Sequence, residues 1–239
     1  MITVIAIDAL EHKLVEDFDF PRLKQTHYGK TDITEFSEPR TMVLWSSFMT
    51  GQNKEAEILA KGDKEMWNVR IPHEETFFSK FENPLVIDLP GYNYDLEQHN
   101  QERALLKTFF DTDGDEKEDI WKKYNQHAFD HHRDVKERFL NALEEGHDFL
   151  LGYFSLADVI GHLNFGNRTM MKMIYRDLDE VASAVKGDLI ILSDHGMKAI
   201  GQFGDHSEYG FWSTNFSDLK TPKITDFAQI ITSMKSNTP

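Results

Sequence analysis

The chain has 239 residues, a length that favours one large domain over two and can bury a substantial core. Its 26 Lys and Arg residues against 41 Asp and Glu residues give a net charge of −15. That charge argues against a nucleic-acid polymer or an anionic membrane as a partner, since such binding needs cations that meet phosphates. The absence of cysteine excludes disulfides, thiolate metal sites and a cysteine nucleophile.

The amino-terminal residues and the hydropathy pattern carry no targeting or membrane signal. The segment from Met1 to Leu10 lacks a basic region followed by an apolar core and a cleavage site. No apolar stretch approaches the roughly 18 residues that suggest a membrane span. We therefore expect a soluble, cytoplasmic protein. A small phosphate compound held at metal ions is compatible with the acidic charge, because bound cations dominate the local field.

Short apolar runs alternate with helical patterns along the chain. Residues 2–7 form a β-branched run that ends at Asp8, which is typical of a buried parallel strand. Similar runs predict strands at residues 85–87, 149–154 and 189–192. Apolar residues at helical spacing predict helices at about residues 101–110, 120–145 and 169–185. Together these patterns predict an α/β fold, a three-layer α/β/α sandwich with a mainly parallel central sheet.

We interpret the whole chain as one unit. Residues 1–239 are expected to form a single catalytic domain with a small helical insertion around residues 95–147. The acidic run from Asp111 to Asp119 resembles a calcium loop, but an EF-hand needs Gly at its sixth position and Glu at its twelfth. Here Gly114 is fourth and Lys122 is twelfth, so the run is interpreted as a solvated turn between two helices.

The segment Asp158-Val-Ile-Gly-His162 follows the strand predicted at residues 149–154. If a helical turn follows that strand, the four-residue spacing puts the carboxylate and the imidazole on one face. Together they can hold one divalent ion. The structural alternative is a capping Asp158 with an incidental His162.

The segment Ser193-Asp194-His195-Gly196-Met197 ends the strand predicted at residues 189–192. Asp194 and His195 can both point into the crevice at the carboxyl ends of the strands, because the chain turns there and Gly196 permits a tight turn. Asp8 stands at the same place after the first strand. An ordinary strand-to-loop turn is the alternative.

Thr41 is a candidate nucleophile. If a helix begins at Met42, Thr41 lies at its N-terminus, where backbone N–H groups and the helix dipole favour an alkoxide and a bound phosphate. A metal or a base must first lower the pKa of the hydroxyl. The alternative is a Thr41 that serves only as an N-cap. His206, shortly after the Asp-His-Gly motif, would complete the ligands of a first ion; alone it would be a loop histidine.

His127, His131 and His132 form a rival cluster in a charged helical segment. His127 and His131 are four residues apart, but a zincin motif needs Glu after the first histidine, where this chain has Ala128. We therefore predict that these histidines lie on a solvated helix face.

The motifs as a set resemble the alkaline phosphatase superfamily, and within it the type I phosphodiesterase/nucleotide pyrophosphatase group. The resemblance runs in order over most of the chain. It is carried by the strand ending at Asp8, Phe20-Pro21-Arg22-Leu23, Thr41 with Ser47 and Thr50-Gly51, Leu89-Pro90-Gly91, Asp158 with His162, Asp194 with His195, and His206.

The resemblance implies two divalent metal ions, with zinc expected first and manganese or iron as alternatives. It implies that one ion is held by Asp158, His162 and His206. It implies that the other is surrounded by Asp8, Thr41, Asp194 and His195. It also implies that Thr41 is the nucleophile and forms a phosphothreonine intermediate.

The sequence departs from the family pattern after the nucleophile. Asn is common three residues on, where this chain has Leu44, and the usual continuation is only partly present as Gln52-Asn53-Lys54-Glu55. The chain is also short, which leaves little room between residues 53 and 147 for a large specificity insertion. A sulfatase is disfavoured, because that branch modifies a Cys or Ser at the position of Thr41.

We therefore expect a metal-dependent hydrolase of phosphodiester or pyrophosphate bonds in small molecules, nucleotides among them. One alternative is a phosphomonoesterase or phosphomutase on the same scaffold, and another is a non-catalytic metal-binding protein. A diester preference calls for an apolar wall, for which Leu44, Trp45 and Leu89 are candidates, although they could equally be core. A homo-oligomer stays open, because a partner subunit could supply a pocket wall.

Overall fold

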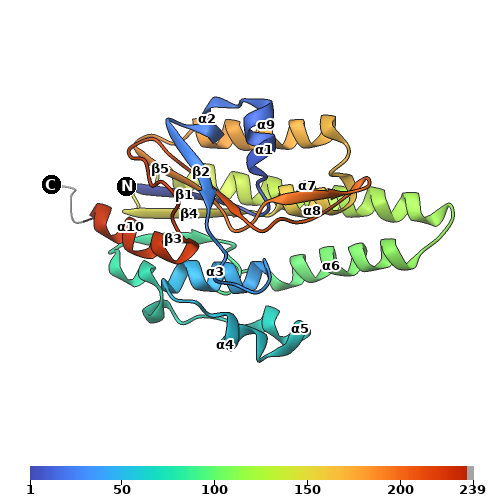
Figure 1. Cartoon of the computed structure of the whole chain (residues 1–239), viewed down its shortest axis with the longest axis horizontal. Coiled ribbons are helices and arrows are strands. Elements are labelled where there is room, and N and C mark those ends of the chain that lie inside the picture. Colours follow the sequence, from blue (N-terminus) through green and yellow to red (C-terminus); the bar gives the residue numbers. More distant parts are fainter. Residues whose placement is uncertain (236–239) are drawn as a thin grey trace.

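The computed structural model describes residues 1–235 and has a six-stranded central sheet with helices on both faces (Figure 1). In spatial order the strands are β2 (His27–Thr31), β8 (Gly210–Thr214), β5 (Asp188–Ser193), β1 (Ile2–Ile7), β4 (Phe149–Phe154) and β3 (Pro84–Ile87). Strands β5, β1, β4 and β3 are parallel, whereas β8 lies antiparallel to β5 and β2. A separate hairpin pairs β6 (Met197–Ile200) with β7 (Phe203–His206). The predicted α/β sandwich with a mainly parallel sheet is confirmed.

Strand β1 shows why the parallel strands are mostly apolar. Its alternate residues Val4 and Ala6 pack into the core on one face of the sheet, and Ile5 and Ile7 pack into the core on the other. Because helices cover both faces, neither set of side chains meets solvent, and the strand has no polar alternation.

Two groups of helices cover the sheet. On the face that Val4 and Ala6 share lie α3 (Thr41–Thr50), α4 (Glu55–Leu59), η1 (Met66–Asn68), η3 (Phe77–Lys80), η4 (Ile224–Asp226) and α10 (Phe227–Lys235). On the other face lie α1 (His12–Phe18), α2 (Pro21–Lys24), α6 (Leu96–Asp111), α7 (Glu116–Ala142), α8 (Leu156–Asn164) and α9 (Arg168–Ser183). The short helices α5 (Gly62–Glu65) and η2 (His73–Glu75) complete the set in the described part of the chain.

The predicted elements match the structure closely, but several short strands were missed. The four predicted strands correspond to β1, β3, β4 and β5, and the three predicted helices correspond to α6, α7 and α9. Residues 112–115 of the acidic run form the predicted turn between α6 and α7, and the rest of the run lies in the ends of these two helices. Strands β2, β6, β7 and β8 were not predicted. None of the helices within residues 1–235 combines the length and apolar character needed to cross a bilayer. The single catalytic domain stays a prediction.

The parallel strands place polar residues at one edge of the sheet. Asp8 follows β1, Asp88 follows β3 and Asp194 follows β5. Helix α8, which carries Asp158, begins just after β4. Because these strands run in the same direction, their carboxyl ends meet and form the edge where α/β proteins bind ligands.

Candidate metal centre and active site

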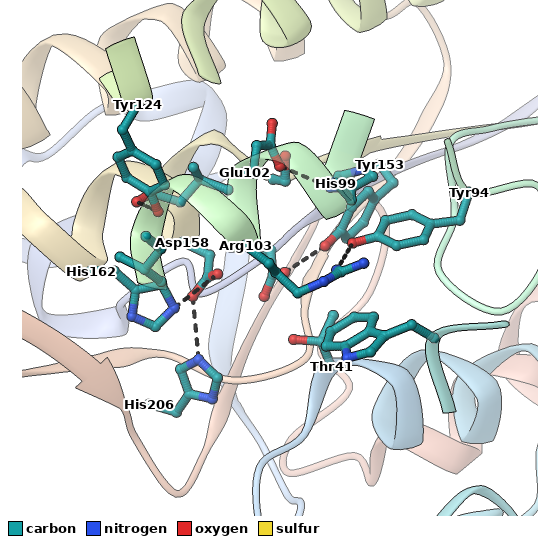
Figure 2. Close-up of a pocket in the computed structure, with 15 residues that line it drawn as sticks. Thr41, Tyr94, His99, Glu102, Arg103, Tyr124, Tyr153, Asp158, His162 and His206 are labelled. Atoms are coloured by element: carbon teal, nitrogen blue, oxygen red, sulfur yellow. Dashed lines mark hydrogen bonds and ion pairs between the residues drawn. The ribbon is translucent and has the colours of Figure 1, made fainter. Parts of the chain in front are cut away.

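Asp158, His162 and His206 form one group of potential metal ligands (Figure 2). The four-residue spacing on α8 brings His162 Nε2 to 3.3 Å from Asp158 Oδ2. His206 Nε2 lies 3.4 Å from the other oxygen, Asp158 Oδ1. Since one ligand atom from each residue lies within 4.8 Å of the others, a single divalent ion could bind all three.

The β6–β7 hairpin positions His206. Its register pairs Met197 with His206, which returns the chain to the end of β5. His206 Nδ1 lies 2.9 Å from the carbonyl oxygen of Pro39. Donation to this carbonyl would leave Nε2 as a free ligand atom directed at Asp158, which is how metal-binding histidines are commonly oriented.

Asp8, Asp194 and His195 form a second group of potential ligands. They follow β1 and β5, which are neighbours in the sheet. His195 Nε2 lies 3.3 Å from Asp8 Oδ1 and 3.4 Å from Asp194 Oδ2. All three residues are buried, so the strand ends hold them rigidly in a site shielded from solvent.

Thr41 lies beside the second group. It is the first residue of α3, and its Oγ1 is 3.4 Å from His195 Nε2. The capping position belongs to Arg40, so Thr41 does not act as the N-cap. The rings of His195 and His206 stack with their centroids 3.9 Å apart, which makes the two ligand groups adjacent. The structure therefore brings all the predicted metal ligands and the predicted nucleophile together.

Several atoms of the two groups are buried without a hydrogen-bond partner. They are Asp8 Oδ1, Asp158 Oδ1, both carboxylate oxygens of Asp194, and His206 Nε2. An unpaired buried carboxylate is costly, and native proteins normally pair it or use it to coordinate a metal. The unpaired atoms belong to both ligand groups, so this arrangement of residues fits two divalent cations.

Burial and nearby charges shift the pKa values of the second ligand group. Burial, and then the charge of Asp158, raise the pKa of Asp8 to about 7. Burial, followed by the charges of Asp8 and Asp158, raises the pKa of Asp194 well above its ordinary value. Burial and the charge of His206 lower the pKa of His195 to about 3. Each shift reflects carboxylates and imidazoles crowded into a low dielectric, a strain that bound cations would relieve.

A cavity of about 220 Å³ opens between Thr41 and the first ligand group (Figure 2). Trp67, Tyr94 and Arg103 contribute to its remaining wall. The Arg103 guanidinium lies 3.9 Å from the centroid of the Trp67 ring and donates to the Tyr94 hydroxyl at 3.3 Å. Of the described residues that line the cavity, only Arg103 is a Lys or Arg, which makes it the natural partner of a second anionic group.

The sequence did not single out several residues of this site, among them Tyr153, Trp67, Tyr94 and Arg103. Tyr153, in β4, donates its hydroxyl to Asp8 Oδ2 at 2.5 Å and so orients that carboxylate. Its one signal in the sequence is a hydroxyl-bearing residue near the end of an apolar strand. Trp67, Tyr94 and Arg103 come from three separate segments, and no local pattern links them.

Leu44, Trp45 and Leu89 do not form the candidate apolar wall; the alternative, that they belong to the core, is the one that the structure shows. All three side chains are fully buried in the hydrophobic core, and none of them lines the cavity. Helix α3 is buried around most of its circumference, so Leu44 and Trp45 pack against protein instead of facing a substrate.

The predicted solvated face of α7 is wrong for two of its three histidines. His131 and His132 are buried, and His132 Nε2 lies 2.6 Å from Asp177 Oδ2 on α9. His131 belongs to a third group of potential metal ligands. The packing of neighbouring helices on α7, which its charged sequence does not reveal, buries these rings.

Comparisons with known proteins found a weak structural likeness. No protein-family model matches the chain, and no curated protein matches it. Among solved structures, murine ectonucleotide pyrophosphatase/phosphodiesterase 5 matches with a TM-score of 0.43 and 12% sequence identity. The match covers 84% of this chain and 58% of that one, so the chain spans little more than half of that structure. A match this weak carries no weight for function, which has to be argued from the site.

Proposed function

We propose that the protein is a metal-dependent hydrolase that cleaves phosphodiester or pyrophosphate bonds of small molecules, nucleotides among them. One observation carries the proposal. The hydroxyl of Thr41 lies 3.4 Å from His195, in one of two adjacent groups of potential metal ligands, and atoms of both groups are buried without hydrogen-bond partners. Two-metal phosphoryl-transfer sites need such an arrangement, with ions that stand about 3.5–4 Å apart.

The two ligand groups have separate roles in this proposal. One ion would be held by Asp158, His162 and His206, and the other by Asp8, Asp194 and His195 beside Thr41. Bound divalent ions supply positive charge that favours ionisation of the Thr41 hydroxyl and balances the charge of a phosphoryl transition state. The N-terminus of α3 favours negative charge at the same position.

Thr41 would carry the covalent step. Its Oγ1 attacks phosphorus while the bond from phosphorus to the leaving oxygen breaks, which produces a phosphothreonine. Water then attacks the same phosphorus, releases the phosphate product and restores the Thr41 hydroxyl. Tyr153 holds the Asp8 carboxylate in place throughout, because its hydroxyl donates to Asp8 Oδ2.

The cavity supports a diester or pyrophosphate over a monoester. Trp67, Tyr94 and Leu106 offer an apolar surface for a second ester group, and Arg103 can pair with a second phosphate. A cavity of about 220 Å³ suits a small substrate. The net charge of −15 likewise disfavours a nucleic-acid polymer.

A paired assay tests the proposal. Hydrolysis of bis(p-nitrophenyl) phosphate and of p-nitrophenyl phosphate is measured with added zinc or manganese for wild type, Thr41→Ala and Thr41→Ser. The exposed Thr34→Ala serves as the matched control. We expect wild type to cleave the diester faster than the monoester. Diesterase activity should fall about 1,000-fold or more in Thr41→Ala, be partly retained in Thr41→Ser, and stay unchanged in the control.

Other outcomes would replace the proposal. Full diesterase activity in Thr41→Ala would remove Thr41 as the nucleophile. Faster monoester cleavage would favour a phosphomonoesterase on the same scaffold. No turnover of either ester, combined with a fold that chelation destabilises, would favour a non-catalytic metal-binding protein.

A further inference from the structure

Asp88, His99 and His131 form a third group of potential metal ligands outside the proposed hydrolase site. They come from the end of β3, from α6 and from α7, and all three are buried. His99 Nε2 lies 3.0 Å and His131 Nε2 2.9 Å from the same oxygen, Asp88 Oδ2. We propose that these residues bind a third divalent cation. Two imidazoles and one carboxylate make zinc the expected ion.

Glu102 orients the rings of His99 and His131 for metal binding. Its Oε2 lies 3.0 Å from His99 Nδ1, and its Oε1 lies 3.1 Å from His131 Nδ1. Metal-binding histidines almost always donate their second ring N–H to a carboxylate, a carbonyl or water. Donation from both Nδ1 atoms to Glu102 leaves both Nε2 lone pairs directed at Asp88, so one side chain sets the tautomer of two ligands.

Two neutral histidines have fewer N–H groups than this group has contacts. Four contacts between ring nitrogens and carboxylate oxygens join Asp88, Glu102 and the two rings. A neutral imidazole has one N–H, so two neutral rings can donate to only two of these contacts. A divalent ion coordinated by the two Nε2 atoms and Asp88 Oδ2 would take the place of the other two contacts.

The geometry suits one ion between the three side chains. The two rings meet edge to face with their centroids 4.6 Å apart, and His99 and His131 are only 2% and 9% exposed. A divalent ion there would be coordinated directly by Asp88, and Glu102 would balance its remaining charge.

The backbone around Asp88 is arranged to hold its carboxylate in one place. Asp88 has a φ of 59°, in the left-handed region that residues other than glycine seldom adopt. Its Oδ1 accepts a hydrogen bond from the backbone N–H of Asp95 at 2.7 Å, which leaves Oδ2 for the two histidines. Conformations of this kind persist where the surrounding structure fixes a functional group.

The third site adjoins the wall of the cavity. His99 and Glu102 line it, and the ring of Tyr94 stacks on His99 with centroids 3.7 Å apart (Figure 2). Arg103 follows Glu102 on the same helix. A cation bound here would tie α6 and α7 to β3 and thereby hold this wall in position. The inference does not depend on the proposed reaction, because it concerns metal content and not turnover.

Metal content tests the proposal. Purified protein is loaded with zinc, freed of unbound metal and analysed for zinc per chain by mass spectrometry. We expect three equivalents in wild type, two in His131→Asn and three in the control His127→Asn, one helical turn away. The double variant Asp158→Asn/Asp194→Asn, which disrupts both ligand groups of the hydrolase site, should retain one equivalent.

Cobalt and a conservative variant keep the test decisive if His131→Asn does not fold. The double variant titrated with Co²⁺ should show the visible bands of cobalt bound to nitrogen and oxygen ligands. Adding Glu102→Gln, which leaves all three ligands in place, should weaken zinc binding about 10–100-fold in competition with a chelator. Absence of the cobalt bands, or unchanged zinc affinity in the Glu102→Gln background, would overturn the proposal.

The two proposals fail in different ways. Two equivalents of zinc in wild type, both lost in the double variant, would refute the third site and leave the hydrolase proposal standing. A single equivalent that survives the double variant but disappears in His131→Asn would establish the third site and refute the two-metal hydrolase.

Discussion

Glu11 holds the β6–β7 region against α1, and its replacement by alanine is predicted to destabilise the protein. The side chain is buried and its carboxylate accepts four hydrogen bonds. Oε2 accepts from the backbone N–H of Met197 at 3.0 Å and from the Ser207 hydroxyl at 3.4 Å. Oε1 accepts from the Tyr209 hydroxyl at 2.8 Å and from the backbone N–H of Lys13 at 3.0 Å.

The magnitude follows from which donors can reach water in Glu11→Ala. The N–H of Met197 is buried and would lose its partner, at a cost of about 1–3 kcal/mol. Glu11 is also the N-cap of α1, and loss of its bond to Lys13 costs about 1 kcal/mol. Tyr209 is partly exposed and the Ser207 contact is long, so they add little. The total is about 3 kcal/mol, which lowers the Tm of a chain of this size by about 6–12 °C.

Urea denaturation followed by circular dichroism checks this value. Glu11→Gln keeps the shape but loses the charge of the acceptor, so it should cost about 1 kcal/mol. Glu16→Ala, at an exposed position on the same helix, should stay within about 0.5 kcal/mol of wild type. The reasoning is refuted if the free energy of unfolding of Glu11→Ala also lies within about 0.5 kcal/mol of wild type.

Three further predictions concern metal, packing and pH. Chelation should lower the Tm and added zinc should restore it, because the buried carboxylates of both ligand groups are left without a cation that balances their charge; a Tm insensitive to chelator would contradict this. In Gly210→Ala the new Cβ would lie 2.2 Å from the carbonyl oxygen of Ser193, a backbone atom, so calorimetry should show a loss of about 2 kcal/mol or more. Although burial opposes the shift, hydrogen bonds from His132 and Lys136 lower the pKa of Asp177 from 3.8 to about 2. That carboxylate therefore stabilises the fold above pH 3.8 and loses its contribution as pH falls towards 2. Discounted for a side chain that is 35% exposed, Asp177→Asn should cost about 1 kcal/mol near pH 6 and less near pH 3, and an equal cost at both would refute the assignment.

The strands that could be predicted are those in which burial produces a run of neighbouring apolar residues. Strands β1, β4 and β5 are mostly apolar because both of their faces are covered. Strand β2 has no such pattern, and it exists because it pairs with β8, with Gly29 opposite Trp212. A strand stabilised by a partner far away in the chain leaves little local signal.

The metal-ligand candidates could be predicted for a related reason. Asp8 and Asp194 directly follow apolar strands, and the spacing of Asp158 and His162 puts both on one helical face. The cavity wall could not be predicted. An aromatic side chain in the core and one at a cavity look alike in sequence, so the sequence left Trp45 open as a wall or a core residue. The structure places Trp45 in the core and Trp67 at the cavity.

By itself, the sequence determined the parallel strands, the helices between them and the polar residues at the strand ends, because each follows from the chemistry of neighbouring residues. Only the tertiary structure decided which of these residues meet. The β6–β7 hairpin returns His206 to Asp158, and the packing of α6 against α7 gathers His99 and His131 around Asp88. Contacts of this kind join residues tens of positions apart, and their geometry is set by how whole elements pack, which no local pattern encodes.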